Sequence, residues 1–179
     1  MALKIEIPKE LSHLKLDDRG YPIPFFVSII NGKPEFRFMD HNRVKMIIEN
    51  KLCHICGNKL YKDYHYFISG PLGLQNRISS DAAMHRVCAE FSLMACPHLY
   101  LQKAERRDND ELGKLVGSQP SPVVKEKPSV LFLVKSSKFK TIEHQGQTYI
   151  KYNPVSSELY TYVYGKLQKQ ITKITDTNE

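Results

Sequence analysis

The chain has 179 residues, of which 41% are hydrophobic and 25% charged, with ten tyrosines, eight phenylalanines and no tryptophan. These proportions are ordinary for a globular protein and allow a hydrophobic core without disulfide stapling. The formal net charge of +7 favours anionic partners, such as nucleic acid or an acidic protein surface. The basic residues are spread along the chain, which argues against a dedicated nucleic-acid-binding tail.

Residues 1–16 lack the apolar segment of a signal peptide, and no apolar run approaches the roughly 18 residues of a membrane-spanning helix. We therefore expect a cytoplasmic protein. Because thiols stay reduced in that compartment, the four cysteines are interpreted as metal ligands or core residues and not as disulfides.

The first regular element expected is a β-hairpin. After a polar lead-in over residues 1–18 and a turn-rich stretch over 19–24, two β-rich runs at 25–30 and 33–38 flank Asn31-Gly32. That dipeptide is the strongest short hairpin signal, and Pro34 marks the second strand as an edge strand. This edge could pair with a second copy of the chain, so the oligomeric state stays open.

Two helices are predicted around a central strand. Asp40 can cap the first helix, whose apolar positions recur at helical spacing until residue 52. Residues 64–68 are predicted as a strand and residues 69–80 as a loop. The second helix is expected to run from Ala82 to about Ala95, with Ser80 or Asp81 as its cap.

The last third of the chain is predicted to be a small antiparallel sheet. Its strands are expected at 130–134, 139–143, 148–152, 159–164 and 167–171, with turns at 145–147 and at Gly165. Residues 105–128 are interpreted as a linker or exposed excursion. The predicted organisation is thus an α+β zinc-stabilised region over 1–104, this linker, and an antiparallel β region over 129–179 that packs on the first.

Four residues form a candidate zinc site. Cys53-x-x-Cys56-Gly57 can place two thiolates on a tight turn, and His85-x-x-Cys88 supplies a second pair at the start of a predicted helix. A knuckle, a hairpin and a helix start in this order predict a treble-clef-like zinc core. Four protein ligands leave no open coordination position, so we expect a structural Zn²⁺.

Other interpretations of these residues remain open. Cys88 could be a buried apolar thiol and His85 a surface histidine. His54 competes as a ligand from inside the knuckle. Cys96 lies roughly 12 Å further along the helix than Cys88, which favours a core role. His98 is interpreted as structural or exposed.

Several motifs occur in a recognisable order: RGYPIPFFV at 19–27, PEFR at 34–37, CxxCG at 53–57, GP at 70–71, NRxS at 76–79, HxxCAE at 85–90 and CP at 96–97. Together they resemble a family of small bacterial and phage proteins of unknown function, over about residues 19–175. The resemblance implies zinc binding and a bacterial or phage-infected cytoplasm, but no activity. In that family the position of His98 is usually apolar, which implies that His98 is not a ligand.

Three surfaces are candidates for binding nucleic acid or another partner: Arg19, Tyr21 and Arg37; Asn76 and Arg77; and Lys135, Lys138 and Lys140. Each has a simpler structural explanation. Tyr21 can pack on the hairpin, Asn76 can satisfy a turn, and the lysines can protect a sheet edge.

The sequence therefore predicts a zinc-stabilised nucleic-acid-binding module. The alternative is a protein–protein interaction factor, for example a phage protein that binds a host complex. A treble-clef metal-dependent nuclease is the third hypothesis, but the histidine spacing of that class is missing, and no catalytic set is assigned.

Overall fold

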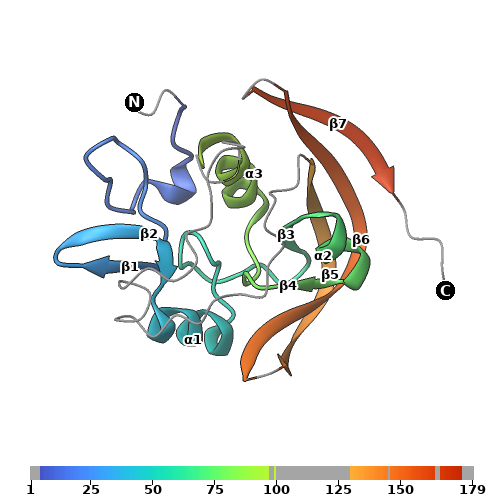
Figure 1. Ribbon diagram of the computed structural model, residues 1–179, viewed down its shortest axis with the longest axis horizontal. Coiled ribbons are helices and arrows are strands. Elements are labelled where there is room, and N and C mark those ends of the chain that lie inside the picture. Colours follow the sequence, from blue (N-terminus) through green and yellow to red (C-terminus); the bar gives the residue numbers. More distant parts are fainter. Residues whose placement is uncertain (1–4, 97–98, 100–129, 145, 164–165, 175–179) are drawn as a thin grey trace.

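The computed structural model describes residues 5–96, 99, 130–144, 146–163 and 166–174, without the side chains of Arg37, of 162–163 and of 166–174. In chain order the elements are the 3₁₀ helix η1 (Lys9–Leu11), β1 (Val27–Ile30), β2 (Lys33–Met39), α1 (His41–Asn50), β3 (His65–Ser69), α2 (Pro71–Asn76), β4 (Ile78–Ser79), α3 (Arg86–Ala95), β5 (Val130–His144), β6 (Gln147–Val163) and β7 (Lys166–Ile174). In this described part of the chain, three α-helices and two antiparallel sheets confirm the predicted α+β class (Figure 1). The predicted linker at 105–128 lies outside the described residues. Within the described residues, no helix combines the length and apolar character that crossing a membrane requires.

The first hairpin and helix form as local sequence chemistry predicts. Strands β1 and β2 pair antiparallel around Asn31 and Gly32, whose φ angles of 51° and 76° are those of a two-residue hairpin turn. Asp40 then caps α1 by accepting a hydrogen bond from the Arg43 backbone N–H at 3.1 Å. The helix ends at Asn50 because Lys51 adopts a left-handed conformation with φ 52°.

The larger sheet joins strands from both ends of the chain. Its order is β3-β5-β6-β4, and β7 also pairs with β6. Strands β4 and β7 share one edge of β6 at different positions, since β4 pairs with residues 150–151 and β7 with residues 157–163. The long β5–β6 hairpin curves along one side of the molecule, far from the small β1–β2 hairpin (Figure 1).

The strands predicted at 130–134 and 139–143 form one strand, β5. The register with β6 shifts on both sides of Ser136, so the polar segment between them is a β-bulge and does not interrupt the strand. Ser136 is fully buried, and its hydroxyl lies 2.7 Å from the Lys138 carbonyl and 2.8 Å from the Asn153 carbonyl. The contact with Asn153, 17 positions away on β6, holds the two strands together where the regular ladder is lost.

The predicted loop at 69–80 contains two further elements, α2 and β4. Pro71 sits in the first turn of α2, where its missing N–H has no cost. The Tyr152 hydroxyl of β6 donates to the Gly73 carbonyl at 2.8 Å and thereby ties α2 to the sheet. The third helix also begins later than predicted, at Arg86 and not at Ala82, because Met84 pairs with Tyr66 through two backbone hydrogen bonds.

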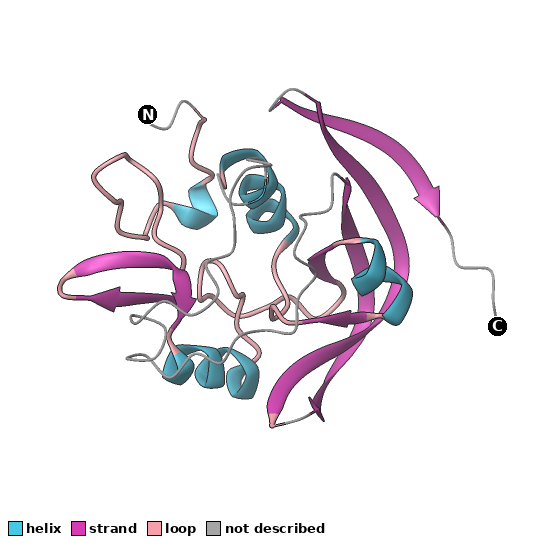
Figure 2. Ribbon diagram, viewed as in Figure 1, coloured by secondary structure: helices cyan, strands magenta, loops and turns pink. Residues whose placement is uncertain are grey.

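The hydrophobic core lies between α3, the larger sheet and the cysteine-bearing loops. Phe67 of β3 is fully buried and stacks on Tyr152 of β6 with 4.8 Å between ring centroids. Leu93 of α3 and Leu133 of β5 are also buried in this cluster. Loops and turns run through the middle of the molecule between these elements (Figure 2), and the core therefore surrounds the segments that carry the predicted metal ligands.

Candidate metal centre

Residues 52–59 form a tight knuckle just after α1. The Cys53 N–H donates to the Asn58 carbonyl at 2.7 Å, and the Gly57 N–H donates to the Cys53 carbonyl at 2.9 Å. Gly57 has a φ of 73°, a conformation that L-residues with side chains rarely adopt. This geometry brings the Cys53 and Cys56 side chains together, and both residues are buried.

The second pair of residues comes from the start of α3. His85 is the N-cap residue of the helix and Cys88 lies in its first turn, so both side chains point to the same side. The knuckle is anchored to the segment before His85, because the His54 N–H donates to the Ala83 carbonyl at 2.9 Å. The structure therefore brings together the four residues that the sequence predicts as ligands.

The four side chains lie close enough together to share one metal ion. One ligand atom from each residue lies within 4.8 Å of all the others. His85 Nδ1 is 3.4 Å from Cys56 Sγ and 3.9 Å from Cys88 Sγ. A tetrahedral Zn²⁺ with ordinary bond lengths requires about 3.6 Å between nitrogen and sulfur. Cys53, Cys56, His85 and Cys88 are thus positioned to bind a metal ion.

Neighbouring groups orient the histidine for this task. His85 Nε2 lies 3.0 Å from the Lys59 carbonyl, which keeps the proton on Nε2 and leaves Nδ1 free to bind a metal. The His85 backbone N–H points at Cys53 Sγ at 3.4 Å and favours negative charge on that sulfur. The Tyr61 ring covers the imidazole, with 4.5 Å between ring centroids.

The side chains of the cluster shift one another's pKa values strongly. Hydrogen bonds with Cys56 and Cys88 lower the pKa of the Cys53 thiol. Hydrogen bonds with Cys53 and Cys56 raise the pKa of His85 to about 10. The same contacts with Cys53 and Cys56 raise the pKa of the Cys88 thiol, so negative charge concentrates on Cys53 beside the protonated His85. A metal ion bound by all four residues would displace the protons from Cys88 and His85.

The structure does not place the other candidate ligands, Cys96, His98 and His54, in the described cluster. Cys96 is the partly exposed C-cap residue of α3 and does not belong to the cluster. His98 falls outside the described residues. His54 is buried and stacks on Phe26, with 4.2 Å between ring centroids.

His54 has a role that the sequence did not reveal. Neither of its ring nitrogens has a hydrogen-bond partner among the described residues, and Nε2 is 3.9 Å from Asp81 Oδ1. Burial lowers the pKa of His54 and favours the neutral imidazole. His54 therefore acts as an aromatic packing residue between the knuckle and Phe26, just before β1, and nothing in its local sequence distinguishes this role from that of a ligand.

The predicted Arg19–Tyr21–Arg37 patch is brought together only in part. Arg19 lies over the Tyr21 ring, 5.1 Å from its centroid, and also over Phe36 at 5.7 Å. An ion pair to Asp17 at 2.8 Å partly neutralises Arg19. The Arg37 side chain lies outside the described part of the chain. Asn76 and Arg77 are exposed at the C-terminal end of α2, where Arg77 has a φ of 58°.

A basic surface on the larger sheet is better defined. Phe139 and Tyr152 are paired across β5 and β6, and both rings contact Phe67 on the core side. Since side chains alternate along a strand, their neighbours point to the opposite side. This outward group, here named the lysine face, consists of Lys135, Lys138 and Lys140 on β5, Tyr149 and Lys151 on β6, and Tyr64 before β3.

The lysine face contains three predicted residues and three that sequence reasoning missed. Lys135 Nζ lies 3.5 Å from the centroid of the Tyr64 ring. Lys140 and Lys151 are directly opposite each other across the two strands, and both are exposed. Tyr64, Tyr149 and Lys151 could be assigned to this face only once the strand register was known.

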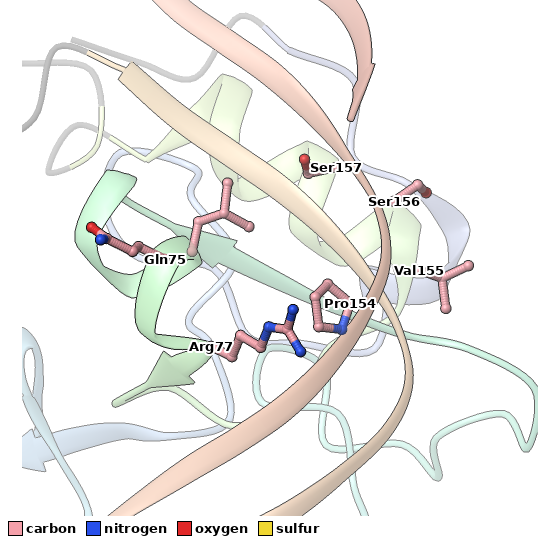
Figure 3. Close-up of a pocket in the computed structure, with 7 residues that line it drawn as sticks. Gln75, Arg77, Pro154, Val155, Ser156 and Ser157 are labelled. Atoms are coloured by element: carbon pink, nitrogen blue, oxygen red, sulfur yellow. The ribbon is translucent and has the colours of Figure 1, made fainter. Parts of the chain in front are cut away.

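The described part of the molecule has two hollows, one near α2 and one beside the knuckle. One has a volume of about 160 Å³ and is lined by α2 and by residues 154–157 of β6. Figure 3 shows the Arg77 guanidinium beside Pro154, whereas the Gln75 amide points away. The other is an open groove of about 540 Å³ between residues 13–15, the β1–β2 hairpin and the knuckle.

Comparisons with known proteins provide no further assignment, because the chain matches no protein-family profile, no curated protein and no solved structure.

Proposed function

We propose that this protein is a small zinc-stabilised module that binds nucleic acid through the lysine face. The family resemblance would place it in a bacterial or phage-infected cytoplasm. The zinc and the binding surface have separate roles. The metal holds the fold together, and the sheet presents the charges.

Zinc is the metal that best suits the donor set. Three thiolates and one imidazole are soft and borderline ligands, and a closed tetrahedral arrangement of them is typical of structural Zn²⁺. Four protein ligands leave no position for water or substrate, so the arrangement does not favour a metal-dependent nuclease. A treble-clef-like core is supported by the knuckle and by the start of α3. The segment between them, however, contributes β3 and β4 to the larger sheet and not to a hairpin of their own.

The lysine face is the observation that carries the nucleic-acid proposal. Lys138, Lys140 and Lys151 are exposed on one side of the β5–β6 hairpin, and no acidic side chain of the described residues pairs with them. Two like charges directly opposite each other, as Lys140 and Lys151 are, disfavour the free sheet. A bound polyanion would relieve this repulsion and release its counterions.

Salt-dependent binding tests this proposal. Fluorescence anisotropy with labelled 20-nucleotide oligonucleotides should show affinity that falls steeply between 50 and 200 mM salt. The triple variant Lys138→Gln, Lys140→Gln, Lys151→Gln should weaken binding and reduce the slope of log K against log salt by about 2 to 3.

A second triple variant serves as the matched control. Lys9, Lys15 and Lys33 are exposed in the N-terminal region, away from the lysine face, and their change to Gln removes the same net charge. This control should keep most of the affinity. Equal losses in the two variants, or no salt-sensitive binding of any oligonucleotide by the wild type, would refute the proposal.

Protein binding is the second candidate function, and the open groove beside the knuckle favours it. Its lining is largely apolar and includes Ile29, which is 46% exposed. A stoichiometric partner that survives high salt in a pulldown, and is lost in Ile29→Asp, would support this alternative.

A further inference from the structure

We infer that the lysine face takes a single-stranded nucleic acid, whose backbone follows β5 and whose bases stack on Tyr64 and Tyr149. This inference rests on the proposed function and adds the class of ligand to it. It depends on how the charges are spaced and on where the two tyrosines lie.

The charges form a narrow row. Lys138 and Lys140 are two residues apart on β5, which corresponds to about 6.7 Å along the strand. Lys151 lies opposite Lys140 on β6, and the Cβ atoms of such a pair are about 5 Å apart. A duplex presents two phosphate rows separated by a groove about 6 or 12 Å wide. A row this narrow matches one phosphate backbone better than two.

The two tyrosines flank this row. Tyr64 is level with the bulge of β5, because the next residue, His65, pairs with Ser136. Tyr149 pairs with Ile142 near the turn of the hairpin. Measured along β5, the two tyrosines are therefore about five residues, or about 17 Å, apart, and Lys138 and Lys140 lie between these two levels.

Both rings are held in place yet remain accessible. Tyr64 is 42% exposed. The Lys135 ammonium lies against one face of its ring, 3.5 Å from the centroid. The Tyr149 hydroxyl donates to Gln147 Oε1 at 2.7 Å, which restrains a partly exposed ring. Exposed aromatic rings beside cations are the usual means of binding unpaired bases without sequence preference. In a duplex the base faces are already stacked and could not use these rings.

Helix α3 lies on the same side of the sheet as the lysine face and limits the space for a ligand. Arg86 of α3 lies over the Tyr66 ring, 5.8 Å from its centroid, and Tyr66 is the register partner of Lys135. Helix α3 thus covers this side of the sheet up to Lys135, and the open part is the ribbon from Lys138 to the turn. A flexible single strand can follow this twisted ribbon beside the helix.

The experiment compares three ligands and two double variants. Anisotropy is measured at 50 mM salt with a labelled 20-nucleotide DNA strand, the RNA of the same sequence, and the 20-base-pair DNA duplex. We expect each single strand to bind at least tenfold more tightly than the duplex. Tyr64→Ala with Tyr149→Ala should weaken single-strand binding by at least tenfold and duplex binding little.

The matched control is Tyr64→Phe with Tyr149→Phe, which keeps both rings and should keep single-strand affinity within about threefold. Thermal unfolding checks that each variant is folded, and the single variant Tyr149→Ala replaces the double variant if the latter is not. Equal affinity for strand and duplex, or no effect of the alanine changes on strand binding, overturns this inference while leaving the proposed function intact. Absence of salt-sensitive binding to all three ligands overturns both.

Discussion

At the scale of single residues, Gly57 combines two constraints in the metal knuckle. Its φ of 73° disfavours any side chain, and an added Cβ would lie 2.7 Å from Cγ of Phe25. The first constraint recurs at Gly146, with a φ of 72°, but there the space around a Cβ is open. Substitutions at Gly57 and Gly146 can therefore be compared to separate the cost of backbone strain from the cost of the contact with Phe25.

We predict that Gly57→Ala destabilises the protein much more than Gly146→Ala. Both changes should cost about 1 to 2 kcal/mol for the left-handed backbone, and Gly57→Ala should cost about 1 to 3 kcal/mol more for the displaced phenylalanine. Urea unfolding of the zinc-loaded proteins measures the difference. Equal effects would show that Phe25 moves aside without cost.

Asp17 organises the loop that leads to Tyr21. Its carboxylate accepts hydrogen bonds from the backbone N–H groups of Arg19 and Tyr21, each at 2.9 Å. Burial alone would raise the pKa of Asp17, but the hydrogen bonds from Tyr21 and Arg19 and the charge of Arg19 outweigh it and lower the pKa. The ionised carboxylate therefore stabilises the folded state.

We predict a pH-dependent effect of Asp17→Asn. Because the folded pKa lies below the unfolded value of about 3.9, the stabilisation is complete above about pH 5 and is lost as the pH falls through the folded pKa. The difference in urea midpoint between wild type and variant should thus be constant from pH 7 to 5 and shrink below pH 4. A difference that grows towards acid pH would contradict the assignment.

At the scale of elements, the bulge in β5 decides which residues share a face. Ser137 is the additional residue on β5 and Val155 the additional residue on β6, so Lys135 and Lys138 stay on the same side of the sheet. Without the bulge, every side chain beyond it would point to the other side. The buried Ser136 hydroxyl is the main polar group that holds this geometry, and it also accepts the Asn153 N–H at 3.1 Å.

We predict that Ser136→Ala lowers the free energy of unfolding by about 1 to 3 kcal/mol, because buried backbone groups lose their partner. Ser137→Ala, at the adjacent and less buried position, should change it by less than about 0.5 kcal/mol. Chemical denaturation measures both, and hydrogen exchange at Asn153 should increase only in the first variant. An unchanged exchange rate at Asn153 would show that the bulge does not depend on this hydroxyl.

At the scale of the whole molecule, the metal centre connects segments that are far apart in the chain. The knuckle follows α1, whereas His85 and Cys88 begin α3, and the core packs around both. Binding free energy at such a site is also folding free energy. The metal is therefore expected to stabilise the molecule as a whole and not only a loop.

We predict that the purified protein contains one Zn²⁺ per chain and that a chelator causes cooperative loss of tertiary structure. Cys53→Ser and Cys88→Ser should bind less than one equivalent, and Cys96→Ser should keep the full equivalent, since Cys96 lies outside the cluster. Elemental analysis and near-UV circular dichroism measure these outcomes. A wild type that stays folded and equally stable after complete metal removal would refute a structural zinc.

Several features of the molecule could be predicted from sequence because they depend on a few neighbouring residues. The Asn31-Gly32 turn, the Asp40 cap and the two pairs of candidate ligands each act within about four positions, so their chemistry is visible in the local sequence. The predicted domain boundaries at 104 and 129 remain a prediction. The sheet nevertheless contains strands from both sides of that segment.

Tertiary structure decided the features that depend on distant partners. Helix α2, strand β4 and the late start of α3 are specified by contacts such as Tyr152 with Gly73 and Met84 with Tyr66. The lysine face follows from the β5–β6 register and its bulge, in which Ser136 bonds to Asn153. The sequence by itself determined which residues could bind a metal. Only long-range pairing determined which lysines and tyrosines share a surface, because a shift of one residue in a strand moves each side chain to the opposite face.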